Sequence, residues 1–488
     1  MPNYPIEKWT SKHAILLFYL VLIAFLLTVG LALWTKVYLV AGIPFVLVCC
    51  GIFFIKPLWL LYLFMAVLPF SMEVELGSLG TDLPSEPILL GLAIIGFWAI
   101  LTKSRTLRSY YSHPLFIILL LHLVWSFCCI LSSGNTIFSL KYALSKSWYI
   151  FGSVAASIWL IQSKEVLQRL LLILAFSMLV TVIIINVEHG MTGFLFDTIN
   201  AAANPLYRNH VIYAVFIVMV LPFLFVLRGD TRKQSMARLL MDSAIALILF
   251  ASYFAYTRGA WLAVLLLPVV WYLIYKKILK IAYPLALVGA VVFFMYLSKD
   301  YHYLRYAPNF ETTVYHDDLE DHLTATFEGE DMSTMERFHR WIAAFRLFKQ
   351  YPIMGIGPNT FVDRYKPYTS PSFETYISEN EERSTVHNYF IYILAEQGIV
   401  GFLIVVILVG YFFIHGEKRY ATFYDPDLKR WYLACLLCGF VFWLNNLFSD
   451  LLEANKVAPL WLMSVAWMIL LEKWDEKKKS QAHTVSTD

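Results

Sequence analysis

Three short motifs place a polar side chain at the border of a long apolar run. Arg208 lies in NPLYRNH, Arg258 in TRGAWL and His387 in STVHN. A guanidinium is permanently charged and forks onto two phosphate oxygens, whereas a histidine can take a proton near neutral pH. Around one cleft, these residue types would hold a diphosphate and deprotonate a hydroxyl group without a metal ion.

Each motif also has an ordinary explanation. An arginine at the end of a membrane helix usually extends to the lipid headgroups, and an interfacial histidine often does no more than start a helix. Two further residues are candidates for a supporting role: Asn388, which follows His387, and Glu396, nine residues after the histidine. At 1.5 Å per residue, Glu396 lies about 13 Å further along a helix. It orients a partner in the core or is a packed carboxyl group.

The composition indicates which elements position these side chains. Of the 488 residues, 59% are hydrophobic and 15% are charged, and the mean hydropathy is +0.63. A soluble domain carries roughly 25% charged residues, so the chain is no ordinary soluble enzyme. The net charge of +3 is too small to indicate nucleic-acid binding. The six cysteines all fall inside apolar runs, which predicts neither a disulfide framework nor a metal site.

We therefore expect an all-α, polytopic membrane protein with about 12–14 transmembrane helices, since a crossing helix needs about 20 mostly apolar residues. Fourteen apolar runs are candidates for these spans: 13–33, 37–55, 57–71, 87–102, 113–132, 148–162, 166–186, 209–227, 239–256, 260–275, 278–297, 388–414, 430–449 and 457–471.

The basic residues predict the orientation of the spans. With the N-terminus inside, 23 of the 38 Lys and Arg residues fall on the cytoplasmic side, as the positive-inside rule requires. Both termini are then cytoplasmic, and all three motifs face outward. The predicted segments are helices 1–11 in 1–297, an external loop in 298–386, helices 12–14 in 387–471 and a cytoplasmic tail in 472–488.

The loop 298–386 is expected to be functional, because long external loops usually are. Its 89 residues include 9 basic and 15 acidic ones, a formal charge of −6. The first half, with the acidic stretch His316–Asp331, is solvated. In the second half, Ser333 and Glu336 have capping-box spacing and predict a helix over about 334–350 that ends before Pro352.

This helix is predicted to be amphipathic and to rest at the membrane surface. Arg337 and Arg340 lie on one of its faces. An apolar stripe occupies another face: Phe338, Trp341, Ile342, Phe345 and Phe348.

The order of these elements resembles a known family. The stretch HNYFIYILAEQGIVG, from His387 to Gly401, is similar to the signature of bacterial O-antigen ligases and related O-antigen polymerases. RGAWL, which begins at Arg258, resembles a second short motif of the family. The segment YPIMGIGP, from Tyr351 to Pro358, resembles the stretch that precedes the histidine in these proteins.

The resemblance implies a membrane glycosyltransferase of the C type in the bacterial inner membrane, metal-independent and inverting, without a cofactor. Members take a glycan from undecaprenyl diphosphate at the periplasmic face. By this resemblance His387 is the general base, Arg258 and Arg208 bind the donor diphosphate, and Arg337 and Arg340 are carried over by position.

Two alternatives remain open. A ligase moves the glycan to the lipid A core, whereas a polymerase moves it to another lipid-linked repeat; we favour the ligase. A flippase or exporter of lipid-linked sugars could use the same arginines. Transporters often show paired halves or broken spans in corresponding positions, and none is found in the sequence. The long external loop beside a candidate base favours chemistry at the membrane surface.

Overall fold

The computed structural model describes residues 56–76, 79–102, 105–306, 332–375, 378–380 and 383–485, with Ile23, Leu27 and Thr28. The expected spans 13–33 and 37–55 lie almost wholly outside the described residues, and the acidic stretch His316–Asp331 lies wholly outside them. The contacts divide the chain into two units, Met1–Phe64 and Met65–Asp488. In the first unit, residues 57–64 form the first part of a helix, α3.

The chain is a polytopic, all-α membrane protein. Among the described residues, nine helices are long and apolar enough to cross a membrane. Helices suit this solvent because they satisfy every backbone polar group internally. The helices are α3 (Pro57–Val67), η2 (Leu68–Phe70), α4 (Ser85–Thr102), α5 (Arg105–Tyr111), α6 (Pro114–Cys128), η3 (Cys129–Ser132), α7 (Thr136–Tyr149), η4 (Ile150–Ala155), α8 (Ala156–Leu160), α9 (Lys164–Met191), η5 (Phe196–Thr198), α10 (Ile199–Ala203), α11 (His210–Asp230), α12 (Met236–Phe254), α13 (Arg258–Tyr275), α14 (Leu279–Ser298), η6 (Lys299–Tyr306), α16 (Met332–Gln350), α17 (Phe361–Arg364), η7 (Lys366–Tyr368), η8 (Pro371–Phe373), α18 (Tyr389–Thr422), α19 (Pro426–Asn445), η9 (Leu451–Glu453) and α20 (Val457–Val485).

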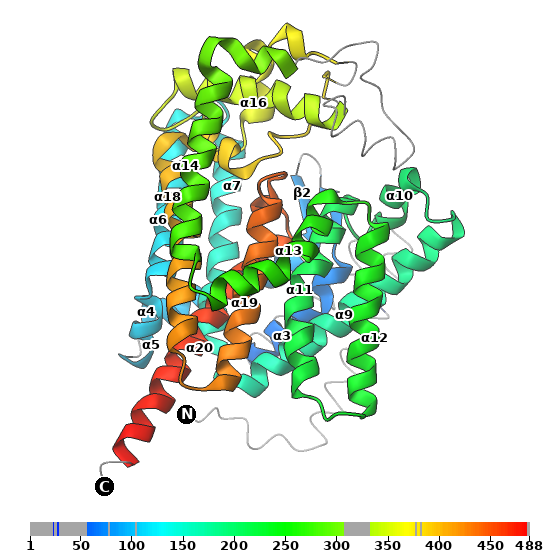
Figure 1. Cartoon of the computed structure of the whole chain (residues 1–488), viewed down its shortest axis with the longest axis vertical. Coiled ribbons are helices and arrows are strands. Elements are labelled where there is room, and N and C mark those ends of the chain that lie inside the picture. Colours follow the sequence, from blue (N-terminus) through cyan, green and yellow to red (C-terminus); the bar gives the residue numbers. More distant parts are fainter. Residues whose placement is uncertain are drawn as a thin grey trace. The chain divides into compact units, whose positions relative to one another are not determined.

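The packing of the second unit centres on α11, α18, α19 and α20. In Figure 1, α18 runs along α6 and reaches α16 at one end, while α19 lies beside α11 and α13. The interior is aromatic, with Trp431, Trp461 and Trp467 fully buried. The apolar side chains of α14 remain mostly exposed, as expected for a helix whose neighbour is lipid.

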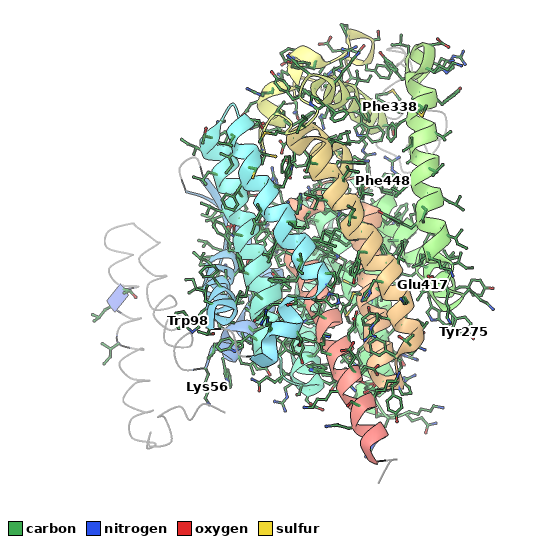
Figure 2. The ribbon with its side chains drawn as sticks, turned by 90° about the vertical axis from the view of Figure 1, so that its left-hand side faces the viewer. Lys56, Trp98, Tyr275, Phe338, Glu417 and Phe448 are labelled. Carbon is green, nitrogen blue, oxygen red and sulfur yellow. The ribbon has the colours of Figure 1, made fainter. Side chains whose placement is uncertain are left out.

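We call the end of the unit that carries α16 the α16 end, and the other the opposite end. Figure 2 shows Phe338 of α16 at the first end and Glu417 of α18 toward the second. The two ends of α18 therefore belong to different surfaces of the bundle. Residues that start α18 lie at the α16 end, and residues near its C-terminus lie at the opposite end.

The predicted span 148–162 is wrong at its start, because the helix begins at Thr136 and continues through α7, a π-helical turn (η4) and α8. Asn135 caps it by accepting a hydrogen bond from the amide of Phe138. The charged Lys146 masked this longer helix in the sequence. In the structure Lys146 is buried and donates hydrogen bonds to the hydroxyls of Tyr142 and Tyr389, at 2.8 and 3.2 Å.

A short hairpin was not predicted. β1 (Met72–Leu76) and β2 (Leu79–Leu83) form an antiparallel pair in which Met72 faces Leu83. The signal was present in the sequence, because MEVEL alternates apolar and acidic residues and a Gly-Ser pair follows it. The hairpin matters because it forms one wall of a cavity described below.

Candidate active site

The start of α18 is fixed by Asn388. Its side chain accepts a hydrogen bond from the amide of Ile391 at 3.0 Å and donates one to the carbonyl of Leu447 at 2.9 Å. The amide of Tyr389 donates to the carbonyls of Asn446 and Ser449. Asn388 thus caps the helix and ties it to the segment after α19, which gives this supporting candidate a clear positioning role.

His387, immediately before the cap, has a left-handed backbone with a φ of 54°. A non-glycine residue in this region stores strain and is often functional. Its side chain is half-buried, and among the described residues no hydrogen-bond partner of its ring is present. Burial, and then the charges of Arg340 and Arg337, lower the pKa of His387 to about 3. The ring is therefore neutral at physiological pH and can accept a proton.

Arg340 lies in α16 and is buried. Its Nη2 lies 3.2 Å from Oε2 of Glu336, and its Nη1 donates to the carbonyl of Thr385 at 3.3 Å. Glu336 also accepts hydrogen bonds from the hydroxyls of Thr375 and Ser378. Arg340 is thus held by a buried ion pair with Glu336 and by the carbonyl of Thr385, two residues before His387. Arg337 is half-buried and acts on His387 through its charge.

One expectation for α16, the capping box, is wrong. The helix already includes Met332, and Glu336 points into the protein to meet Arg340, so no capping box starts it. The aromatic stripe is half-buried, and another face of α16 is buried more deeply. This deeper face packs against α18 and the segment before it, where small side chains and the ion pair of Glu336 with Arg340 fit. The buried face consists of Met335, Glu336, His339, Arg340, Ala343, Ala344 and Leu347.

Asp450 links this segment to Arg208. It lies in the loop after α19, and Thr385 donates a hydrogen bond to its carboxylate at 2.6 Å. Burial raises the pKa of Asp450, while the charges of Arg208 and Arg340 act against that rise. The side chain of Arg208 is 66% exposed and lies 3.9 Å from Glu73. The charges of Arg208 and Arg340 thus both act on the carboxyl group of Asp450.

Arg258 comes from the segment beside Arg208. It begins α13, and the preceding turn contacts His210, whose Nδ1 lies 2.8 Å from the carbonyl of Ala255 and 3.4 Å from the hydroxyl of Thr257. A Cβ atom added at Gly259 would collide with Asn445, the last residue of α19. The starts of α13 and α18 thus both contact the C-terminal end of α19.

Glu396 does not contact His387. Its carboxylate accepts hydrogen bonds from three consecutive amides, those of Asn359, Thr360 and Phe361, at 2.6, 2.8 and 2.8 Å. Glu396 is fully buried and orients a turn of the loop through these three amides. These three amides lie at the N-terminal end of α17, where a negative charge is favourable.

The glycines at this turn permit its close approach to α18. Gly355 and Gly357 have positive φ angles, and Gly398 breaks the helical conformation of α18 with a φ of 65°. A Cβ atom at Gly398 would overlap the backbone of Ile353. Gly398 thus lets this turn pack closely against α18.

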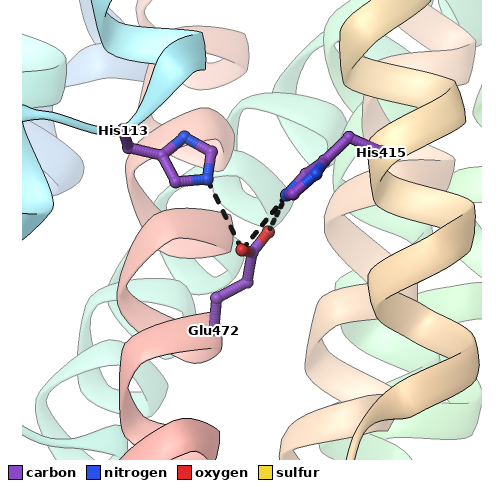
Figure 3. A group of neighbouring side chains, drawn as sticks. All are labelled: His113, His415 and Glu472. Atoms are coloured by element: carbon purple, nitrogen blue, oxygen red, sulfur yellow. Dashed lines mark hydrogen bonds and ion pairs between the residues drawn. The ribbon is translucent and has the colours of Figure 1, made fainter.

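A second cluster of ionisable residues lies at the opposite end (Figure 3). His113, before α6, has its Nε2 3.4 Å from Glu472 of α20, and Nε2 of His415 in α18 lies 3.2 Å from both oxygens of that carboxylate. Glu472 also accepts from the hydroxyl of Tyr432 at 2.7 Å and pairs with Arg419 at 3.2 Å. No pattern in the sequence indicated this group.

The three residues of Figure 3 are close enough to share a cation. Their hydrogen bonds argue for a different role. Nδ1 of His113 accepts from the amide of Leu115, which places the ring proton on Nε2, the atom that faces Glu472. The positive charge of Arg419 already balances the carboxylate. The cluster is best described as a clamp that joins α6, α18, α19 and α20.

The arrangement at the α16 end can bind a doubly charged anion beside a neutral histidine. Its arginines come from three segments, the loop before α11, the start of α13 and α16, and its histidine lies on a strained backbone. Sequence reasoning missed three contributors: Lys146, which binds Tyr389 beside the cap, Asp450, and Lys456, which is buried near Arg208. The signal for the lysines was their position on the side where basic residues are few.

One comparison with known proteins is informative. Residues 243–406 match the family model for O-antigen ligase, which covers about a third of the chain and includes Arg258, α16 and His387. No curated protein matches the chain.

Proposed function

The match to the O-antigen ligase family confirms the resemblance seen in the sequence over residues 243–406, and from this premise we propose that the protein transfers a glycan from undecaprenyl diphosphate to an acceptor hydroxyl. The observation that carries the proposal is His387, a strained and neutral histidine beside a cluster of arginines. We further propose an O-antigen ligase, with the lipid A core as acceptor.

The proposed step is a single displacement. The acceptor hydroxyl oxygen forms a bond to the anomeric carbon while the bond from that carbon to the diphosphate oxygen breaks. The bonding electrons leave with undecaprenyl diphosphate, and the hydroxyl proton passes to His387. Attack opposite to the leaving group inverts the anomeric configuration. Fixed cations stabilise the developing charge of the leaving group.

The arginines divide this work. Arg340 is tied to Glu336 and to the carbonyl of Thr385, so we assign it a positioning role at the His387 segment. Arg208 has an exposed side chain and a long contact to Glu73, so it can turn to a ligand at little cost. Arg258, at the start of α13, is the main diphosphate ligand, and Arg337 assists it from α16.

Binding of the donor would also strengthen the base. The low pKa of His387 follows from burial and from Arg340 and Arg337. A diphosphate that neutralises the arginine charges removes part of this effect, so the pKa of the histidine rises when the donor is bound. The base is thus neutral before binding and more basic in the complex.

The proposed location is the inner membrane, with the site facing the periplasm and both termini in the cytoplasm. Cysteines at Lys349 in α16 and at Lys233 in the α11–α12 turn test this in a background without native cysteines. An impermeant thiol reagent on intact spheroplasts should label the first and spare the second. Equal labelling would overturn the orientation.

The reaction is tested with purified protein, a lipid-linked glycan and two acceptors. A ligase transfers the glycan to the lipid A core and releases undecaprenyl diphosphate, while a polymerase joins two lipid-linked repeats. Transfer should persist in EDTA, because cationic side chains stabilise the leaving group. Formation of longer lipid-linked glycan with no core product would replace the ligase by a polymerase, and transfer to neither acceptor would overturn the function.

A further inference from the structure

A polar cavity of about 370 Å³ lies at Arg208, between the β1–β2 hairpin, the loop before α11 and the loop before α20. Small-molecule sites usually measure about 300–1,000 Å³, so the cavity suits one or two sugar units. Its walls carry Glu73 and Asp82 from the hairpin, and Asn455 and Lys456 from the loop before α20. None of these four residues takes part in the proposed transfer step.

Lys456 is buried, with 4% of its surface exposed. Its amine donates hydrogen bonds to the carbonyls of Pro69, at 2.7 Å, and Leu206, and lies 4.0 Å from the centre of the Tyr207 ring. Burial lowers the pKa of Lys456 to about 7, while Asp82 acts in the opposite direction. A protonated amine has three donors, so one N–H group remains for a ligand in the cavity.

Asp82 is the hydrogen-bond acceptor of the cavity, whereas Lys456 is a donor. It is 7% exposed, and burial raises its pKa, while a hydrogen bond from Asn455 and the charge of Lys456 act against that rise. Among the described residues, Asn455 is the sole hydrogen-bonding partner of this carboxyl group. Asn455 is itself fixed by the hydroxyl of Tyr149. The carboxyl group therefore has lone pairs available to hydroxyl donors.

We propose that this cavity is a saccharide subsite, in which Asp82 accepts hydrogen bonds from sugar hydroxyls and Lys456 and Arg208 donate to them. The inference rests on the proposed transfer of a glycan. The mixed charges select the ligand class, because a phosphate would meet Asp82 and Glu73, and a cation would meet Lys456 and Arg208. A neutral polyhydroxylated ligand satisfies both kinds of group.

The position of the cavity fits a substrate that reaches His387. Ala454, Asn455 and Lys456 line it, and Asp450, four residues before Ala454, accepts the hydrogen bond of Thr385 beside the histidine segment. Arg208 connects the cavity with the segment around Asp450, since it lines the cavity and its charge acts on Asp450. A sugar in the cavity therefore lies next to the proposed diphosphate site.

The first test compares Asp82→Asn and Lys456→Met with Lys141→Met. Lys141 is a matched control, because it donates to the carbonyl of Gly80 on the same hairpin but does not line the cavity. Loss of one charge-assisted hydrogen bond costs about 10–100-fold in affinity. The two cavity variants should raise the KM of one glycan substrate by that factor and change kcat by less than about threefold, while the control keeps both constants.

The two substrate sources are separated by measuring the KM of the lipid-linked donor and that of the acceptor core in turn. A rise for the acceptor places the acceptor sugar in the cavity, and a rise for the donor places the donor's glycan there. If every variant folds and both KM values stay at wild-type levels, the subsite does not exist.

A second test does not depend on turnover. A cysteine at Ala454 in the cavity and one at Asp197, which is exposed on η5 and outside the cavity, are labelled with a small maleimide in a background without native cysteines. Lipid-linked glycan or core oligosaccharide should slow labelling at Ala454 by about tenfold or more and leave Asp197 unchanged.

The outcomes separate the two proposals. Undecaprenyl diphosphate without a sugar should not protect Ala454, and protection by this lipid alone would overturn the subsite. Protection by a glycan with no transfer to any acceptor would retain the subsite and overturn the transfer reaction. Transfer without protection of Ala454 would retain the reaction and overturn the subsite.

Discussion

α18 carries a histidine site at each end, and the two sites are built in opposite ways. His415, roughly 39 Å along the helix from Tyr389 at 1.5 Å per residue, shares the carboxylate of Glu472 with His113, Arg419 and Tyr432. His387, before the helix, has a strained backbone and no hydrogen-bonded ring partner among the described residues. One site is held together by internal ion pairs and hydrogen bonds, and the other is open to a ligand.

The difference shows where to look for chemistry in a membrane protein. Charged groups in both sites are expensive to bury. At the opposite end the charged groups pair with Glu472, so the cluster stabilises the packing of the helices that carry them. At the α16 end the histidine and Arg208 keep unused hydrogen-bonding capacity, and the protein holds them there with caps and ion pairs. Unused capacity on a well-fixed backbone is the mark of a site.

The largest expected effect is on stability at the opposite end. Glu472→Ala leaves Arg419 without its buried partner and removes the acceptor of Tyr432, which should lower the free energy of unfolding by about 3–5 kcal/mol. Denaturant unfolding in detergent measures it. Glu476→Ala is the control, since Glu476 also pairs with Arg419 but is exposed, and it should cost less than about 1 kcal/mol. Equal stability of both variants would break the comparison.

Glu396 extends the comparison to the middle of α18. It is as saturated as Glu472, so its loss should act on stability and on the loop it orients. Glu396→Gln places an amide NH₂ against three backbone donors and should destabilise the protein by about 2–3 kcal/mol. Limited proteolysis of the loop around Asn359 should speed up in parallel. Glu379→Gln, an exposed change in the same loop, is the control, and identical proteolysis of both would contradict the assignment.

Arg258 tests the open site with a smaller effect. Arg258→Ala should lower kcat/KM about 10–100-fold, because a charge-assisted hydrogen bond to the diphosphate is lost in both the ground and the transition state. Arg258→Lys should recover part of it, since an ammonium cannot fork onto two oxygens. Arg232→Ala, in the α11–α12 turn, should have no effect. Full activity of Arg258→Lys would mean that charge alone is needed there.

The smallest effect concerns acid stability. The pKa of His387 is about 3 in the folded protein and near 6.5 when unfolded. The unfolded state therefore binds the extra proton first, and this residue lowers stability as pH falls below 6.5. Between pH 7.5 and pH 5, the free energy of unfolding of the wild type should fall by more than that of His387→Gln or His387→Asn. If the free energy of unfolding of all three proteins depends on pH in the same way, the pKa of His387 is not lowered in the folded protein.

Much of the fold followed from the sequence. The apolar runs from 87–102 to 457–471 correspond to helices in all but the start of α7, and the helix after Ser333 was foreseen because Pro352 and the apolar periodicity bound it. Lys146 hid the start of α7, because a buried lysine needs hydrogen-bonding partners. One of its partners, Tyr389, is far away in sequence.

The candidate site was predictable in its residue types but not in its contacts. His387 and Arg258 stood out because polar side chains at the border of apolar runs are costly. The sequence could not show that Glu336 would turn inward to Arg340, that Glu396 would bind three amides, or that His113 and Glu472 would meet across four helices. Each of these contacts joins segments whose proximity is set by tertiary packing alone.

The most direct test of the central claim is the transfer rate of His387→Gln, measured with saturating donor and acceptor beside its melting temperature and donor affinity. If His387 takes the acceptor's proton, the rate should fall by about 10²–10⁴-fold, while donor affinity and melting temperature stay at wild-type levels or above. A well-folded His387→Gln protein with near wild-type turnover would contradict the account, because His387 would then be no more than the residue before a helix cap.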